Sequence, residues 1–139
     1  MLFRSIICSG AVLEQMILPA LQRGGYTAQA QVLTGARPGG GPHKVDALAE
    51  KDGRRILISM KWQQSSGTAE QKVPFEVMCL ADAVREKLAD CAYLVLGGTG
   101  WTLRTYFTSG ALQEHLVHAG LVKIVTLEEF IAITNEGRL

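Results

Sequence analysis

The stretch from residue 44 to residue 61 contains two short apolar runs on either side of the polar turn KDG at 51–53. Asp-Gly between two apolar runs is a strong signal for a tight β-hairpin. Because side chains alternate along a strand, Ser59 and Lys61 share one face of the second run, and pairing brings Asp46 of the first run beside them. Burying either charge alone would cost several kcal/mol. The hairpin therefore requires a salt bridge, a metal ion or a solvent-filled cleft at this place.

The overall composition is that of one folded domain. The chain has 139 residues, of which 47% are hydrophobic, which is enough for a single core but not for two. We therefore expect one domain over residues 1–139. The net charge of +1 gives no overall basic field for nucleic acid, although Lys and Arg clustered on one side would still form a local basic surface.

The hydrophobic spacing and the turn signals predict nine elements in the order α-β-β-β-α-β-α-β-α. They are a helix over 9–23 that Pro19 kinks or splits, a strand over 26–33, strands over 44–50 and 54–61, a helix over 69–89, a strand over 91–98, a mainly helical stretch over 101–120, a strand over 121–126 and a helix over 127–137 capped by Thr126. The segment 34–43, rich in Gly and Pro, is expected to be a mobile loop. This order predicts an α/β fold with a mixed central sheet flanked by helices.

The three cysteines and the N-terminus bear on the cellular location. Cys8, Cys79 and Cys91 are far apart in apolar surroundings, so we interpret them as buried thiols of a reducing compartment, without zinc-ligand spacing. Glu14 interrupts the apolar N-terminal stretch, and we expect neither a signal peptide nor a membrane span. The expected location is the cytoplasm of a bacterial or phage-infected cell.

The hairpin and the helix after it resemble a known family. The segments "VDALAE" and "ILISMKWQQ", followed by a helix that begins "GTAEQKVPFEV", look like the PD-(D/E)XK nuclease superfamily with its restriction-endonuclease-like fold. The family pattern is a glutamate on a first helix, an acid on one strand, and an acid-x-lysine on the next. The resemblance covers residues 9 to 96, about two thirds of the chain. It implies a Mg²⁺-dependent DNA endonuclease of the restriction, homing or junction-resolving type, with Mn²⁺ as a substitute ion.

The resemblance also implies roles for individual residues. Asp46 matches the first metal-binding acid. Lys61 matches the lysine that orients or deprotonates the attacking water and steadies the charge of the phosphorane. Glu14, on the first helix, matches the auxiliary glutamate. Gln63 matches a polar position that is often seen two residues beyond the lysine.

This sequence departs from the family pattern at the second acid, where it has Ser59. A serine hydroxyl is a poor Mg²⁺ ligand. The Ser-x-Lys arrangement resembles a subset of restriction enzymes in which the following helix supplies the missing carboxylate. Glu76 and Glu70 are the two candidates here, and we prefer Glu76 because it borders the apolar stripe of the helix. The expected metal ligands are then Asp46, Glu76 and Glu14, with Lys61 and Gln63 completing the catalytic set.

The expected partners are DNA and a second copy of the chain. The residues expected to contact phosphates lie around the Gly-rich loop and on the following helix, and are Arg37, His43, Lys44 and Lys72. A core this small has little room for a separate recognition domain, and cutting both strands needs two sites. We therefore expect a homodimer or a higher homo-oligomer.

Two alternatives of other classes stay open at this stage. In the first, motivated by Ser59, the chain is a catalytically inactive nuclease-fold subunit that binds DNA or an assembly partner. In the second, it is a small α/β structural module in which Asp46 and Lys61 form only an ion pair. Cleavage of plasmid DNA that is lost on Lys61→Ala would distinguish an active nuclease from the first alternative. Metal binding that is unchanged by Asp46→Asn would favour the second.

Overall fold

A five-stranded mixed sheet lies at the centre of the computed structural model, which describes residues 9–139. The strands follow the chain order across the sheet and are β1 (Thr27–Ala36), β2 (Pro42–Lys51), β3 (Arg54–Trp62), β4 (Cys91–Gly97) and β5 (Val122–Thr126). The first three strands pair antiparallel, whereas β3, β4 and β5 pair parallel. The order α-β-β-β-α-β-α-β-α, the α/β class and the mixed sheet are as the sequence predicts.

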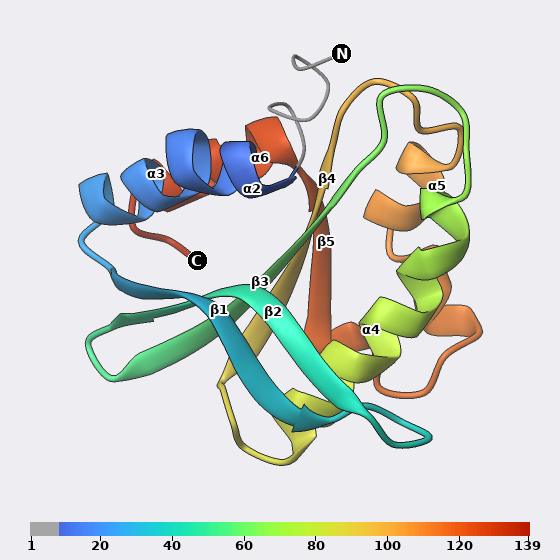
Figure 1. The fold of residues 1–139 in the computed structure, drawn as a ribbon, viewed down its shortest axis with the longest axis horizontal. Helices are drawn as coiled ribbons and strands as arrows, with labels where there is room; N and C mark the ends of the chain where they lie inside the picture. Colours follow the sequence, from blue (N-terminus) through green and yellow to red (C-terminus); the bar gives the residue numbers. More distant parts are fainter. Residues whose placement is uncertain (1–8) are drawn as a thin grey trace.

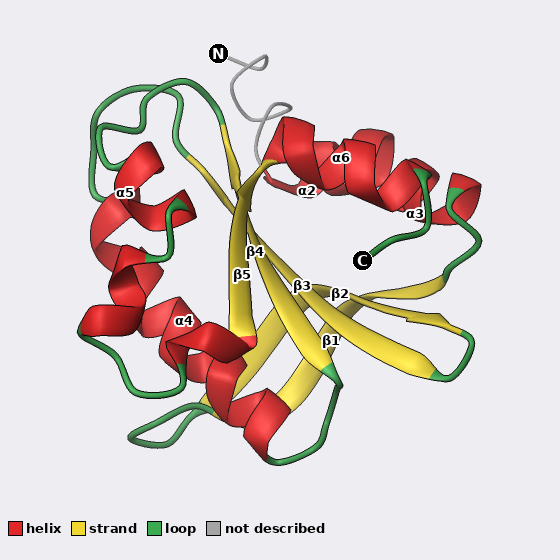
Figure 2. Ribbon diagram, turned by 180° about the vertical axis from the view of Figure 1, so that it is seen from behind, coloured by secondary structure: helices red, strands yellow, loops and turns green. Residues whose placement is uncertain are grey.

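Helices cover both faces of the sheet (Figures 1 and 2). On one face lie the N-terminal helical segment, made of α2 (Ser9–Val12), a π-helical turn (Leu13–Ile17) and α3 (Leu18–Arg23), and the last helix α6 (Leu127–Asn135). On the other face lie α4 (Ala69–Arg85) and α5 (Arg104–Thr108). The parallel connections from β3 to β4 and from β4 to β5 carry helices on this second face, as crossovers between parallel strands require.

Proline divides the N-terminal segment, as the sequence predicts. Pro19 has no backbone N–H and cannot complete the bond that the helix needs at this position. The turn before it widens, and the N–H of Leu18 donates to the carbonyl of Leu13, five residues back. A π-helical turn is one of the recognised ways for a helix to absorb such a break.

The two hairpins differ from the expected boundaries at one point. Asp52 and Gly53 both have positive φ, 53° and 81°, as a two-residue hairpin turn of the primed type requires. The other hairpin is longer than predicted, because β1 and β2 extend into the segment 34–43. Only residues 37–41 connect them, and the N–H of Arg37 donates to the carbonyl of Gly41 to close the turn.

The mainly helical stretch predicted over 101–120 is divided into short pieces. Only α5 is α-helical there, and two short 3₁₀ turns follow it, Ala111–Glu114 and Ala119–Leu121. Gly110 (φ 86°) and His118 (φ 69°) adopt the left-handed conformation, which a continuous helix cannot contain. The helix α4 likewise ends at Arg85, four residues early, and Lys87 (φ 65°) follows it.

Thr126 does cap the last helix. Its side chain accepts from the N–H of Glu129, and the Glu129 carboxylate accepts from the N–H of Thr126 in return. This capping box satisfies two backbone donors that a helix start leaves free. Within the described residues no helix is long and apolar enough to cross a membrane.

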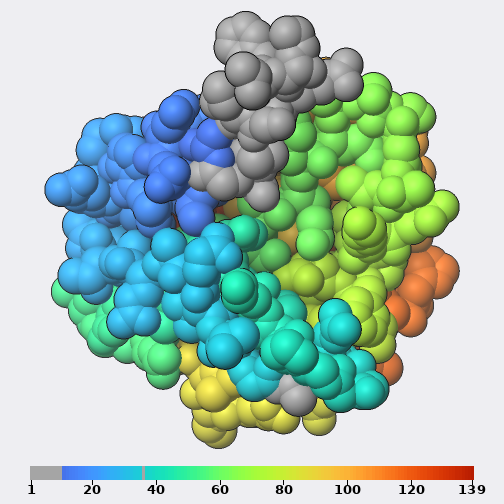
Figure 3. Space-filling view, viewed as in Figure 1, coloured from blue at the N-terminus to red at the C-terminus, as the bar shows by residue number. Residues whose placement is uncertain are grey.

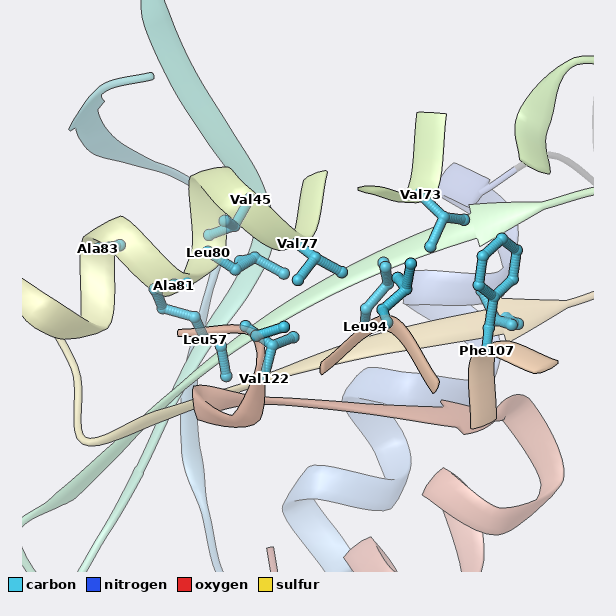
Figure 4. Close-up of a cluster of buried hydrophobic side chains, with 14 of the residues drawn as sticks. Val45, Leu57, Val73, Val77, Leu80, Ala81, Ala83, Leu94, Phe107 and Val122 are labelled. Atoms are coloured by element: carbon cyan, nitrogen blue, oxygen red, sulfur yellow. The ribbon is translucent and has the colours of Figure 1, made fainter. Parts of the chain in front are cut away.

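Two hydrophobic clusters hold the layers together, one on each face of the sheet. The cluster under α4 contains Val73, Val77 and Leu80 of the helix and Leu57 and Leu94 of the sheet (Figure 4). The cluster on the other face joins the N-terminal segment and α6 to the middle strands. Successive residues from Ala92 to Leu96 of β4, and from Ile56 to Ile58 of β3, alternate between the two clusters, so the middle of the sheet is buried on both sides.

Replacing a buried valine should destabilise the protein, whereas the same replacement on the surface should not. Val95 is fully buried in β4, and Val117 is 81% exposed. We expect Val95→Ala to lower the free energy of unfolding by about 2 kcal/mol through lost burial and a residual cavity. Val117→Ala should change it by less than about 0.5 kcal/mol. Urea denaturation of both variants measures the difference, and equal effects would contradict the assignment of the core.

Candidate active site

The strands β2 and β3 separate from each other beside Asp46. Their ladder runs from the pair Lys51 and Arg54 to the pair Ala47 and Ile58 and goes no further. Beyond this point the N–H of Met60 donates to Asp46 Oδ2 at 2.7 Å, so a side chain takes the place of the next ladder carbonyl. Figure 1 shows the two strands running together and then diverging, with α4 across the opening. A fork of this kind opens a site within the sheet without leaving a buried N–H unpaired.

The neighbouring strand β1 is also irregular at this level. Gln31 has a left-handed backbone with φ 57°, and the pairs Ala30–Ala47 and Val32–Val45 flank it on either side. Val45 packs in the α4-side cluster, whereas Ala47, two residues on, packs in the opposite one. Asp46 therefore lies at a bend where the strand changes face. Such irregularities in strands are common beside functional sites, because they redirect a side chain.

The helix α4 brings Glu76 to this opening. The valine and leucine stripe of the helix packs onto the sheet, and Glu76 next to it is only 9% exposed. His43 Nε2 lies 3.0 Å from Glu76 Oε2, and His43 Nδ1 lies 2.7 Å from Thr34 Oγ1. Both partners are buried, so the imidazole fixes the direction of the carboxylate.

Lys61 and Ser59 come from the far arm of the fork. They share a strand face with Leu57, which packs in the α4-side cluster. Ser59 is 3% exposed, and Lys61 is half-buried. The positive charge of Lys61 lowers the pKa of both Asp46 and Glu76, so the ammonium group lies within electrostatic reach of the two carboxyl groups. The structure thus brings an acid of β2, an acid of α4 and a lysine of β3 to one place.

The pKa values of the Asp46 and Glu76 carboxyl groups are shifted in opposite directions from their ordinary values. Burial raises the pKa of Asp46, and the negative charge of Glu76 adds to this, while the Met60 N–H and Lys61 oppose it without cancelling it. Burial also raises the pKa of Glu76, but the hydrogen bond with His43, the Ser59 hydroxyl and the charges of Lys61 and His43 bring it below its ordinary value. Glu76 is therefore the more firmly ionised of the two acids.

A comparison with known protein families assigns the chain to one of them. Residues 8–138 match the model of the PD-(D/E)XK nuclease superfamily domain, and this match spans nearly the whole chain. The protein belongs to the PD-(D/E)XK nuclease superfamily. The family match thereby extends past residues 9 to 96, to which the sequence resemblance was confined.

The other comparisons add no assignment. No curated protein matches the sequence. Among solved structures, a crystal structure of a protein of unknown function, AF1548, is similar with 14% identity and a TM-score of 0.48. The similarity covers 79% of this chain and 54% of that one, so the chain spans about half the length of that protein.

The side chains of Gln63 and Glu70 form hydrogen bonds that connect two parts of the chain. Gln63 is 5% exposed, and its side chain donates to the carbonyl of Gly100 and accepts from the N–H of Ala69. Glu70 accepts from the N–H groups of Thr102 and Leu103, both at 2.6 Å. Both side chains tie the region of α4's start to the loop before α5. These contacts give both side chains a structural role, and the expected catalytic role of Gln63 stays a prediction.

Glu14 lies on the N-terminal helical segment, as expected. It lies in the π-helical turn with an exposed side chain. Among the described residues, its charge is not one of those that shift the pKa of Asp46 or Glu76. Its expected role as an auxiliary ligand remains a prediction.

The residues expected to contact DNA divide into a surface group and a buried one. Arg37, Lys44 and Lys72 are exposed. His43 is only 6% exposed and hydrogen-bonded at both ring nitrogens, so it presents little surface to a phosphate, and its expected contact with DNA stays a prediction. Figure 3 shows the end of β3 and the loop after it (green) between the N-terminal helical segment (blue) and α4 (yellow-green).

Sequence reasoning did not predict that Thr34, His43 and Cys79 gather beside Glu76, although it expected a buried Cys79 thiol. One signal for His43 was present, because His43, Val45, Ala47 and Ala49 recur with the period of two that marks buried strand positions, and all four are buried. Cys79 follows Glu76 by three residues and so lies on the same side of α4. Burial raises the pKa of the Cys79 thiol to about 11. These side chains come from three elements, β1, β2 and α4, and α4 is far from the two strands in sequence.

The opposite pKa shifts of Asp46 and Glu70 predict opposite effects of neutralising these two acids. A raised pKa in the folded state means that ionised Asp46 opposes folding above its unfolded pKa, so Asp46→Asn should stabilise the protein at pH 7. The hydrogen bonds from Thr102 and Leu103 lower the pKa of Glu70, so its carboxylate favours folding at pH 7 and Glu70→Gln should destabilise.

The differences in stability between each variant and the wild type should become smaller at low pH. The gain from Asp46→Asn should shrink as the pH falls through the raised pKa of Asp46, and the loss from Glu70→Gln should shrink as the pH falls through the lowered pKa of Glu70. Denaturant midpoints of the wild type and both variants between pH 7 and pH 3 provide the measurement. Changes of the same sign at pH 7 would contradict the two environments described above.

Proposed function

We propose that this protein is a Mg²⁺-dependent endonuclease that hydrolyses phosphodiester bonds of DNA. The observation that supports this most is the position of Glu76: a buried, firmly ionised carboxylate beside Ser59, within electrostatic reach of Asp46 and Lys61. It supplies from a helix the negative charge that the strand lacks at Ser59. Membership of the superfamily supports the class of reaction.

The donor set fits a hard divalent ion. Asp46 uses one carboxyl oxygen to accept the Met60 N–H, and among the described residues no hydrogen bond engages the other. Glu76 contributes a second carboxylate, held by His43. Mg²⁺ prefers carboxylate oxygens and water, usually with only one or two carboxylates from the protein. When bound, the ion would polarise the scissile phosphate and make a bound water more acidic.

The protein's own groups would act on the phosphate and the nucleophile. Lys61 supplies an ammonium group that orients the attacking water and offsets the negative charge that grows on the phosphorane. His43 keeps Glu76 in one orientation, and the Met60 N–H does so for Asp46. Preorganised groups of this kind need no rearrangement at the moment of reaction.

The surroundings are suited to a nucleic-acid backbone. An open cavity of about 390 Å³ lies along the loop that follows β3 and is lined by residues 62–69 and by Lys72. Arg37 and Lys44 lie exposed at and beside the tip of the β1–β2 hairpin, so cations are available on two sides. Phosphate contacts of this type give affinity without sequence preference. We further propose a homodimer, because cleavage of both strands needs two such sites.

Removing the charged groups of the fork should abolish cleavage. With supercoiled plasmid and Mg²⁺, we expect Lys61→Ala and Glu76→Gln each to lower the rate by at least about a hundredfold, the usual scale for groups that act in the transition state. Lys123→Ala and Glu128→Gln provide matched surface controls, since both residues are exposed and lie on β5 and α6. Undiminished cleavage by Lys61→Ala would rule out this site.

Metal binding should depend on the carboxylate of β2. Titration calorimetry with Mg²⁺, and with Mn²⁺ as the tighter-binding substitute, should show binding to the wild type that is lost or at least about tenfold weaker in Asp46→Asn. Binding to Lys61→Ala should persist, because that change removes no ligand. Metal binding by a protein that cleaves no DNA would instead favour the inactive, DNA-binding or assembly subunit. Unchanged binding by Asp46→Asn would favour a purely structural ion pair.

A further inference from the structure

Three potential metal ligands of different chemistry meet behind the proposed Mg²⁺ site. His43, Glu76 and Cys79 offer an imidazole nitrogen, a carboxylate oxygen and a thiol sulfur that all lie within 4.8 Å of one another. His43, Glu76 and Cys79 are 6%, 9% and 3% exposed as residues. We propose that these residues form a second metal site, selective for a borderline-soft divalent ion such as Zn²⁺, which shares Glu76 with the Mg²⁺ site.

The chemistry of the set selects the ion. Cysteine sulfur is a ligand for Zn²⁺ and similar transition metals, whereas Mg²⁺ binds oxygen almost exclusively. Three protein ligands with one open position form the usual catalytic or exchangeable zinc site. With metal–ligand bonds of about 2.0–2.3 Å, tetrahedral ligand atoms lie roughly 3.3–3.8 Å apart, so small rotations of these side chains would close the site.

The backbone places the ligands so that little else must move. Glu76 and Cys79 are separated by three residues on α4 and point to the same side of the helix. His43 enters from β2, and its ring already contacts the Glu76 carboxylate at 3.0 Å. On metal binding, Nε2 would exchange this contact for the ion, and the Cys79 thiol would release its proton to solvent as the sulfur–metal bond forms.

Thr34 supplies the supporting contact that a metal-bound histidine needs. Its Oγ1 lies 2.7 Å from His43 Nδ1 and 3.3 Å from the carbonyl oxygen of His43. When Nε2 binds an ion, Nδ1–H can donate to this hydroxyl, and the hydroxyl can donate to the carbonyl. Such contacts fix the tautomer and the ring orientation of metal-bound histidines.

Sharing Glu76 has a functional consequence, which rests on the proposed nuclease function. A carboxylate drawn toward His43 and Cys79 by Zn²⁺ is withdrawn from Asp46 and Lys61. The two ions would therefore compete, and Zn²⁺ would inhibit cleavage supported by Mg²⁺.

Co²⁺ is the appropriate probe, because a thiolate bound to Co²⁺ gives a charge-transfer absorption in the near ultraviolet. We expect this band on titration of the wild type and of Cys8→Ser/Cys91→Ser, in which Cys79 is the remaining thiol. The band should be absent from Cys79→Ser. Thr34→Val should keep the band but bind Co²⁺ at least about tenfold more weakly. Addition of Zn²⁺ should bleach the band in every variant that shows it.

The controls separate a folding defect from a lost ligand. Far-ultraviolet circular dichroism checks each variant, and His43→Gln replaces Cys79→Ser if the latter does not fold. No charge-transfer band in the wild type, or a band that survives Cys79→Ser, would overturn the proposal. Because the spectra require no DNA, they stand even if the protein cleaves none. If it does cleave, the ratio of rates with and without Zn²⁺ should be lower in the wild type than in Cys79→Ser.

Discussion

The hydrogen bond from the Met60 N–H to the Asp46 carboxylate is what allows the sheet to open without a loss of paired backbone groups. The ladder between β2 and β3 stops at Ala47 and Ile58, and a buried N–H left without an acceptor there would be costly. Asp46 accepts that N–H at 2.7 Å and so satisfies the strand that diverges from it. One side chain thus ends the pairing and supplies a carboxyl oxygen to the space that the divergence creates. Asparagine could keep the first role, but only a carboxylate serves both.

The opening also explains why two acids of similar burial behave differently. Asp46 accepts one backbone N–H. This hydrogen bond does not offset the cost of removing the carboxylate from water, so the pKa of Asp46 is raised. Glu76 is compensated by His43, Ser59 and Lys61, so its pKa is lowered in spite of its burial. Two anions at one place repel, and the structure reduces this by stabilising one of them strongly and placing an ammonium group near both. Glu76 is then the acid of the site that is more firmly ionised, and a bound cation would favour the ionisation of Asp46.

The sequence predicted the parts of this arrangement that depend on local pattern. The Asp-Gly turn predicted the hairpin, and the alternation along β3 put Ser59 and Lys61 on one face. The pairing that was expected to bring Asp46 beside them ends at Ala47 and Ile58, before it reaches Asp46. The stripe of α4 favoured Glu76 over Glu70, and the role of Glu76 as a metal ligand stays a prediction. The segment 101–120 is divided into short pieces because its apolar residues keep helical spacing while Gly110 and His118 adopt left-handed backbone conformations, and the pattern does not register such breaks. The bend at Gln31 and the burial of His43 arise from how β1, β2 and α4 meet. Neither residue carries a local signal of its partners, apart from the period of two along β2.

Moving the second acid from strand to helix changes what must hold it. An acid at position 59 would be oriented by the paired backbone of β3 and β4, whereas Glu76 has a longer side chain on a packed helix and needs a partner to fix its direction. His43 fulfils that need, and Thr34 in turn orients His43. This support places the imidazole of His43 next to the Glu76 carboxylate, and Cys79 adds a thiol. A site built from acids on the strands would instead offer only oxygen ligands. In our proposal, the position of Glu76 that would give a hard-metal site at the fork therefore also creates the conditions for a softer one behind it.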